Sequence, residues 1–258
     1  MTGTGTLLRE LDRWDAEGLT ATIWWRDDDL QRPTPALEPL LAMAEATEWV
    51  PGLAVVPEGA DMGGLAARLA GAGTELLVHG FAHRNHAADG EKKCEFPASR
   101  ALDDKCGDAR AALSALRDAF PELLLPCFVP PWNRIAADLV EALPGCGFRG
   151  LSTFGPRQAS SAVPGLRCVN THSDVIDWRG TREFVGSGAV AAALAAHLEA
   201  RRTGQADPAE PSGLLTHHLV MVGEDWRALE ALMLEVKSHR AVELIAPHDC
   251  FLPVEDLG

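Results

Sequence analysis

Basic residues are scarce in this sequence of 258 residues. There are 23 lysines and arginines against 37 aspartates and glutamates, which gives a formal net charge of −14. A field of this sign repels the phosphates of nucleic acids and of anionic lipid surfaces, so we expect neither as a partner. A small-molecule or glycan substrate without strong negative charge agrees better with this balance. The composition leaves the oligomeric state open.

Long apolar runs and a secretory leader are also missing. No stretch approaches the roughly 18 apolar residues of a membrane span, and residues 1–20 predict an amphipathic helix rather than a signal peptide. The six cysteines are scattered and include no C-x-x-C pair, which favours buried thiols over disulfides or a thiolate metal site. We therefore expect a cytoplasmic protein with no membrane association.

Apolar runs of strand length alternate with amphipathic stretches of helix length along the chain. The runs that predict strands are residues 20–25, 53–56, 75–78, 123–129, 148–154, 166–170, 214–221 and 242–246. Repeated strand-then-helix units predict an α/β fold with a parallel sheet flanked by helices. Their number and the chain length favour a distorted (β/α) barrel of about seven parallel strands. No linker interrupts the pattern, so we expect residues 1–258 to form a single catalytic domain.

Polar side chains follow several of these strands, where catalytic residues of such folds gather. Asp27, Asp28 and Asp29 come directly after the first strand, and His79 and His83 follow a later one. Three adjacent carboxylates favour a bound cation, although the first turn of a helix is the ordinary alternative. Two histidines with one carboxylate form a three-ligand site that leaves positions open for water and substrate. This ligand set suits zinc, and also cobalt, nickel or iron.

Five short motifs, in order over nearly the whole chain, resemble those of the polysaccharide deacetylases with a NodB-homology domain (carbohydrate esterase family 4). They are Trp25-Arg26-Asp27-Asp28-Asp29, His79-Gly80-Phe81-Ala82-His83, Phe128-Val129-Pro130-Pro131-Trp132, Asp174-Val175-Ile176-Asp177-Trp178 and Leu214-Leu215-Thr216-His217-His218. The resemblance implies a distorted β/α barrel, a divalent metal ion and hydrolysis of the N-acetyl group of a sugar-containing substrate.

The resemblance also implies roles for individual residues. The expected catalytic residues are Asp27 as the general base, His217 (preferred) or His218 as the acid, and Asp177 as a tuning residue. The expected metal ligands are Asp28, His79 and His83, with zinc as the first choice of ion. The side chains expected to contact substrate are Pro131, Trp132, Asn133, Trp178, His86 and His172.

Two positions depart from the family pattern. Asp29 stands where glycine is usual, and Val129 stands where an arginine usually pairs with the base. We predict that Arg26 takes over this part by folding back onto Asp29 or Asp27. Strict alternation along a strand would instead turn Arg26 to the opposite face.

Three other functions compete with that of a sugar N-deacetylase. One is an amidohydrolase acting on a smaller, non-sugar amide. Another is a catalytically silent glycan-binding protein, which the missing arginine of the third motif favours. The last is an Fe(II) oxygenase, which the strand–helix alternation and the order of Asp before His disfavour. For a deacetylase without a signal peptide, we expect a nucleotide- or lipid-linked sugar rather than finished cell-wall polymer.

Overall fold

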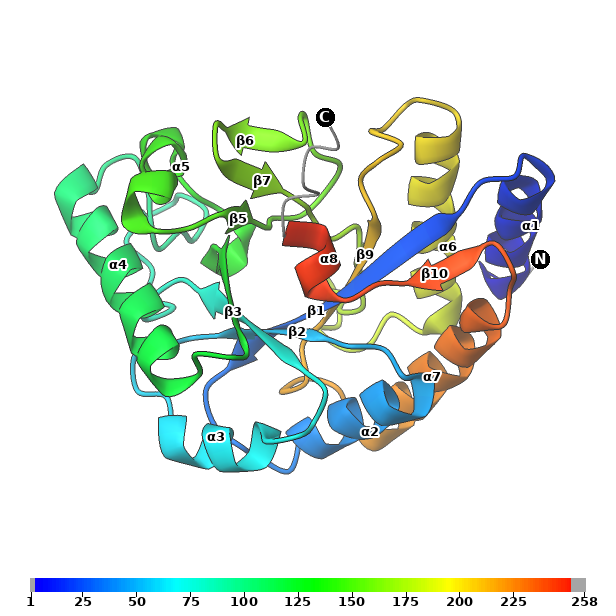
Figure 1. Ribbon diagram of the computed structural model, residues 1–258, viewed down its shortest axis with the longest axis horizontal. Helices are drawn as coiled ribbons and strands as arrows, with labels where there is room; N and C mark the ends of the chain where they lie inside the picture. Colours follow the sequence, from blue (N-terminus) through cyan, green and yellow to red (C-terminus); the bar gives the residue numbers. More distant parts are fainter. Residues whose placement is uncertain (1–2, 252–258) are drawn as a thin grey trace.

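The computed structural model describes residues 3–251 and shows a central sheet surrounded by helices (Figure 1). The strands are β1 (Ala21–Leu30), β2 (Gly52–Val55), β3 (Glu75–His79), β4 (Leu124–Val129), β5 (Gly150–Leu151), β6 (Ser161–Val163), β7 (Leu166–Cys168), β8 (Ser173–Asp174), β9 (Ser212–Thr216) and β10 (Val242–Leu244). The helices are α1 (Gly3–Ala16), α2 (Leu37–Thr47), α3 (Met62–Leu69), α4 (Leu102–Ala119), η1 (Pro131–Asn133), α5 (Ala137–Ala142), η2 (Leu143–Cys146), α6 (Ser187–Arg202), α7 (Gly223–Lys237) and α8 (Pro247–Phe251).

The sheet closes on itself through the chain that runs from β7 to β8. From β5 to β9 the strands are parallel neighbours in the order β5-β4-β3-β2-β1-β9. β7 pairs with β5, and β8 pairs with the far edge at β9. Between them, the backbone N–H of Thr171 donates to Thr153, and that of His172 donates to Gly213. The predicted α/β fold with a distorted barrel is therefore confirmed, while the antiparallel pairing of β6 with β7 was not predicted.

Alternation along β1 divides its side chains between two apolar clusters. Trp24 belongs to the smaller cluster, which combines side chains of β1 to β4 with Val169 and residues of α8 and so fills the barrel. Trp25 belongs to the larger cluster between strands and helices. Phe251 of α8 meets Trp24 edge to face, with ring centroids 5.6 Å apart. Because α8 also lies against Gly52 and Gly150 at the starts of β2 and β5, it covers the amino ends of the strands.

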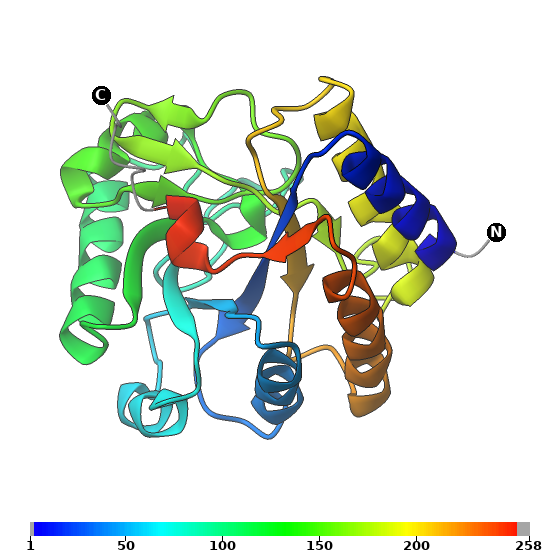
Figure 2. The same cartoon turned by 45° about the vertical axis from the view of Figure 1, so that its right-hand side comes forward.

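The helices form the outer layer of the molecule. α1 and α6 lie side by side at one edge, as the views in Figures 1 and 2 agree. Among residues 3–251, no helix has the length and apolar character needed to span a bilayer. The helical layer and α8 together leave the carboxyl ends of the strands as the place where polar side chains can meet.

Two strand boundaries differ from the prediction and reposition the polar residues. β1 runs through all three aspartates to Leu30 instead of ending before them. Its early part pairs with β10 and its later part with β2, so the long strand has partners along its length. β9 ends at Thr216, and the chain then turns, with the N–H of Val220 donating to the carbonyl of His217. His217 and His218 therefore lie in a turn rather than inside a strand.

Candidate metal and catalytic site

One carboxylate and two imidazoles meet at the carboxyl ends of β1 and β3. Oδ1 of Asp29 lies 3.2 Å from Nε2 of His79 and 3.2 Å from Nε2 of His83. Two ligands that each lie about 2.0–2.1 Å from one ion at a tetrahedral angle are about 3.4 Å apart. The spacing therefore fits a shared metal ion. The structure corrects the expected cluster in one respect, because Asp29 rather than Asp28 stands beside the two histidines.

The two ring nitrogens of His79 have different partners. Its Nδ1 lies 3.0 Å from the carbonyl oxygen of Val129, which can only accept, so Nδ1 carries a proton. Nε2 lies 3.2 Å from Asp29, to which it donates without an ion, and is the nitrogen that would give up its proton to bind a metal. Burial raises the pKa of Asp29, but the hydrogen bond and charge of His79 outweigh it and hold this pKa below its ordinary value. The cluster thus offers an anion and an oriented imidazole.

The backbone of β1 explains why Asp29 leaves the alternating pattern. Its φ is 73°, in the left-handed region, and the pairing of β1 with β2 is irregular between Asp27 and Leu30. A non-glycine residue in this conformation costs about 1–3 kcal/mol, and the rotation brings its side chain to the histidines.

Arg26 and Asp28 form an ion pair inside the barrel. Nε of Arg26 lies 2.9 Å from Oδ1 of Asp28, and Nη2 donates to Oδ2 at 3.1 Å. The guanidinium also donates to Oδ1 of Asn133 and to Oγ of Ser152, each at 2.7 Å. Both charged side chains are buried. The prediction that Arg26 pairs with Asp29 or Asp27 is wrong, because residues two apart on a strand share a face and Arg26 therefore meets Asp28.

Asp27 and His218 form a second buried pair on the opposite face of β1. Oδ2 of Asp27 accepts from Oγ1 of Thr216 at 2.7 Å and from the backbone N–H of His218 at 2.9 Å, while Oδ1 contacts Nδ1 of His218. Burial lowers the pKa of His218, but the charge of Asp27 outweighs it and raises that pKa overall. Asp27 is completely buried. It therefore does not face the histidine cluster as the expected base would.

His217 stands at the edge of the cluster, beside Asp174 of β8 and Trp178 in the segment that follows β8. Its Nδ1 is 3.9 Å from Oδ1 of Asp174, and the Trp178 ring meets its imidazole edge to face, with centroids 4.8 Å apart. Nε1 of Trp178 donates to Oδ2 of Asp174 at 2.8 Å. His217 also lies close enough to help lower the pKa of Asp29. The carboxylate beside His217 is therefore that of Asp174 and not that of the expected Asp177.

The loop after β4 forms the other side of the cluster. The Trp132 ring lies 4.4 Å from the His83 ring, measured between centroids. Trp132 and Asn133 both have φ of 56°, so the loop turns sharply just where the two side chains reach His83 and Arg26. Pro131 is buried and lies against Gly80, where an added Cβ would come within 2.6 Å of its Cδ. Of these three residues, Trp132 alone presents a large face beside the cluster.

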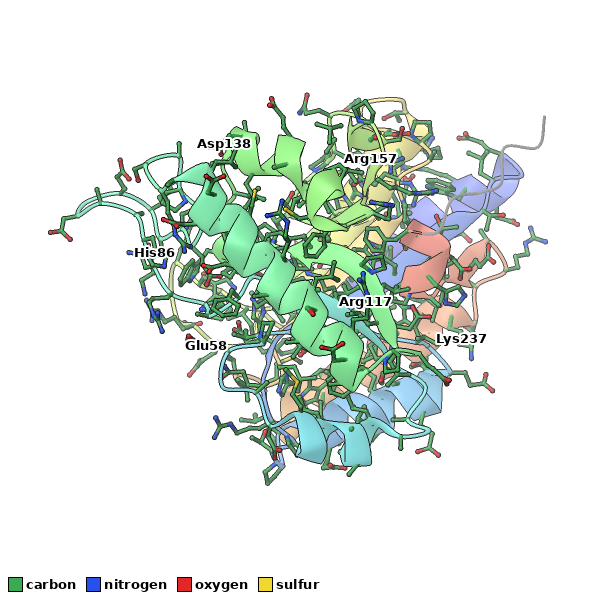
Figure 3. The ribbon with its side chains drawn as sticks, turned by 60° about the vertical axis from the view of Figure 1, so that its left-hand side comes forward. Glu58, His86, Arg117, Asp138, Arg157 and Lys237 are labelled. Atoms are coloured by element: carbon green, nitrogen blue, oxygen red, sulfur yellow. The ribbon has the colours of Figure 1, made fainter. Side chains whose placement is uncertain are left out.

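Three expected residues lie elsewhere. Asp177 accepts the backbone N–H groups of the turn that follows it, from Arg179 and Gly180. His86 is exposed on the loop that stands out beside α4 (Figure 3). The His172 side chain is only 2% exposed, 3.4 Å from Glu210. None of the three contributes to the Asp29 cluster.

His172 belongs to a second cluster, with His197 and Glu210, that does not fit a metal ion. Ligand atoms of the three lie within 4.8 Å of one another. However, Nδ1 of His172 accepts the N–H of Gly213 at 2.9 Å. The one proton of the neutral ring is therefore on Nε2, which faces Glu210 and has no lone pair to offer. The two rings stack with centroids 3.3 Å apart, and the cluster is a buried polar support for β9.

Two residues near the site were missed. Asp174 was given no role of its own, and no spacing rule distinguishes it from Asp177 three residues later. Glu95, which is buried and accepts the backbone N–H of Ala82 at 2.7 Å, lies in a polar stretch without periodicity. Its only sequence signal is its place between Cys94 and Phe96, two apolar residues at the end of a polar stretch.

Comparison with known proteins gives matches in structure alone. No family model and no curated protein matches the sequence. A candidate polysaccharide deacetylase from Mycobacterium smegmatis superposes with a TM-score of 0.63 at 15% identity, over 89% of this chain and 88% of its own. A family 4 carbohydrate esterase from Streptomyces lividans, solved with acetate, gives 0.56 at 14%, over 87% and 91%. A family 4 acetyl xylan esterase from Clostridium thermocellum, solved with a cobalt ion, gives 0.52 at 14%, over 89% and 90%. The chain therefore has the fold of the polysaccharide deacetylases and family 4 carbohydrate esterases.

Proposed function

We propose that this chain is a metal-dependent amide hydrolase that removes the N-acetyl group from a sugar-containing substrate. The observation that carries the proposal is the Asp29 carboxylate 3.2 Å from Nε2 of both His79 and His83. The fold, shared with deacetylases and esterases that act on acetylated carbohydrates, supports the same reaction class. Two imidazoles and one carboxylate leave positions open for water and a carbonyl oxygen.

In this proposal Asp29, His79 and His83 hold the ion, with zinc preferred and cobalt, nickel or iron as alternatives. When bound, such an ion lowers the pKa of its water and polarises the amide carbonyl. The chain then has to supply a base and an acid. We assign the base to Asp28, because its carboxylate lies close enough to His79 to raise that residue's pKa and it is held by Arg26.

The acid is His217, which protonates the departing amine. Asp174 lies beside its Nδ1 and orients the ring, so Nε2 is the nitrogen left to face the substrate. The contact of 3.9 Å is longer than a hydrogen bond, and catalytic contacts of this kind often tighten only when substrate is bound. His218 is engaged with Asp27 and remains the alternative acid.

Two tryptophans support a sugar as the substrate. Trp132 lies against His83 and Trp178 lies against His217, so they flank the proposed ion and the proposed acid respectively. Trp178 is 42% exposed, which leaves an indole face open to a ring-shaped ligand. We also propose that the protein works in the cytoplasm on a nucleotide- or lipid-linked sugar. Six free, buried cysteines agree with a reducing compartment.

The test is acetate release by protein loaded with one divalent ion at a time. Substrates should include an N-acetylglucosamine oligomer, a nucleotide-linked N-acetylglucosamine and a simple N-acetyl amine. We expect acetate from a sugar substrate, loss of release on chelation, and its loss in His83→Ala. His86→Ala is the matched control, since that histidine is exposed three residues away and should leave release unchanged.

The same experiment separates the alternatives. Release from the simple amide alone would favour a small-molecule amidohydrolase. Sugar binding without release would favour a silent binding protein, and consumption of dioxygen would favour an oxygenase. The feature that favoured a silent protein was Val129 in place of the third-motif arginine. Arg26 now supplies a guanidinium at the carboxylate we assign as base, so that feature no longer argues against activity.

A further inference from the structure

We infer that Glu95, on the loop between β3 and α4, is a positioning residue that holds His83 in place to bind the metal ion. The inference rests on the proposed metal site. Oε1 of Glu95 accepts the backbone N–H of Ala82 at 2.7 Å and that of Arg84 at 3.4 Å, and Oε2 accepts that of Phe81 at 3.2 Å. Three N–H groups of the segment that carries His83 thus converge on one carboxylate.

The segment needs such a partner because its backbone is not in a regular conformation. Gly80 has φ of 60° and His83 has φ of 52°. A non-glycine residue in the left-handed region costs about 1–3 kcal/mol, and surrounding contacts must offset that cost. N–H groups turned to one side by such a backbone form a concave site for an anion, and here the anion is the carboxylate of Glu95.

The fit between Glu95 and this segment leaves little room for change. A Cβ at position 80 would lie 2.1 Å from Oε2 of Glu95 and 2.6 Å from Cδ of Pro131. Only glycine can stand there, since other residues would push the carboxylate away from the N–H groups.

Glu95 is itself fixed by its neighbours. On one side, the backbone N–H of Cys94 donates to the carboxamide oxygen of Asn85 at 2.9 Å. Phe96 on the other side is fully buried and meets Phe128 with ring centroids 5.3 Å apart. Because Phe128 belongs to β4, the carboxylate is anchored to the barrel wall, and through it so is the backbone at His83.

Glu95 therefore differs from a residue that merely stabilises the fold. His79 is placed by the end of β3 and by its bond to Val129, whereas His83 lies beyond the strand. The distance from Nε2 of His83 to Oδ1 of Asp29 depends on the loop conformation that the three N–H contacts maintain. Loss of these contacts should weaken metal binding even in protein that remains folded.

The experiment measures the dissociation constant for Co²⁺ or Zn²⁺ by competition with a chelating dye, together with the unfolding curve of the metal-free protein. We expect Glu95→Ala to weaken binding by about 10–100-fold, as for other partners of metal ligands. Glu95→Gln keeps one acceptor oxygen for Ala82 and should lose less than Glu95→Ala. Activity is not needed for either measurement.

Glu210→Gln is the matched control. Glu210 is also fully buried and accepts two backbone N–H groups, from Arg157 and Asn170, at 2.9 and 3.0 Å. It should lower the unfolding midpoint without changing metal affinity. Equal affinities of wild type and folded Glu95→Ala would overturn the inference while leaving the metal site intact. A wild-type protein that binds neither ion would overturn the metal site and the inference together.

Discussion

Replacing Arg26 with methionine should show how much the buried ion pair contributes to the stability of the fold. Methionine keeps most of the apolar length of the side chain but removes its charge. Asp28 would then be a buried carboxylate without its cation, and breaking such a pair on one side typically costs about 3–5 kcal/mol. The hydrogen bonds to Asn133 and Ser152 would be lost as well. We therefore expect the free energy of unfolding to fall by at least about 3 kcal/mol at pH 7.

A double-mutant cycle separates the pair from the loss of packing. Asp28→Asn should also be destabilising, because it leaves the guanidinium unpaired, and Arg26→Met with Asp28→Asn should recover part of the loss. We expect a coupling energy of about 2–3 kcal/mol from denaturant unfolding with chelator present. The pair of Arg68 with Glu38 is the control, since it is close but solvent-exposed and should couple by about 1 kcal/mol or less.

The cycle can refute the reasoning directly. A coupling energy at or below that of the surface pair would mean that Arg26 does not neutralise Asp28. Kinetics provide a second, independent readout. In metal-loaded Arg26→Met, turnover should fall and the acidic limb of the pH–rate profile should move to higher pH, because a carboxylate without its cation is harder to ionise. An unchanged limb together with unchanged turnover would remove Arg26 from the site.

Three further outcomes are expected. Asp29→Asn should lose most bound metal, whereas Asp27→Asn should keep it and lose stability; equal metal contents by elemental analysis would contradict the assignment of Asp29. Asp174→Asn should lower turnover by about 10²-fold or more, and Asp177→Asn, the control, should leave it nearly unchanged. Similar turnover in the two variants would contradict the role given to Asp174. Burial lowers the pKa of His197 to about 2, so its neutral form contributes stability above the ordinary pKa of about 6.5 that is lost as pH falls. The loss should reach about 2 kcal/mol at pH 5. If the free energy of unfolding of His197→Gln fell as much between pH 7 and pH 5 as that of the wild type, His197 would not be its cause.

The barrel could be predicted because its signals are local and repeated. Strand-length apolar runs followed by amphipathic stretches fix the order of elements, and carboxyl ends of parallel strands meet at one edge. His79 and His83 are found by the same argument, since one ends β3 and the other lies four residues on. The turn after β9 that carries His217 and His218 was harder to predict. The predicted strand extends to Met221, whereas β9 ends at Thr216.

The roles of the three aspartates could not be read from the sequence. Alternation assigns faces only while the backbone stays extended, and nothing in three identical residues marks the one with positive φ. Asp29 leaves the pattern, so the carboxylate beside the two histidines is that of Asp29, one residue after the expected Asp28. Asp174 and Asp177 present the same difficulty. The second closes its own turn through bonds to the N–H groups of Arg179 and Gly180, and such a turn is visible only in three dimensions.

The arrangement along β1 also explains how the chain dispenses with the arginine of the third motif. That arginine would stand at position 129 on β4, where Val129 instead joins the apolar filling of the barrel. Arg26 enters the same interior from β1, on the face it shares with Asp28, and reaches across to Asn133 beyond β4 and Ser152 beyond β5. A cation at the end of a closed barrel can be supplied from any strand whose inward face points there. In the proposed site a guanidinium lies beside the carboxylate assigned as base, and the barrel allows the strand that supplies it to differ without changing that charge.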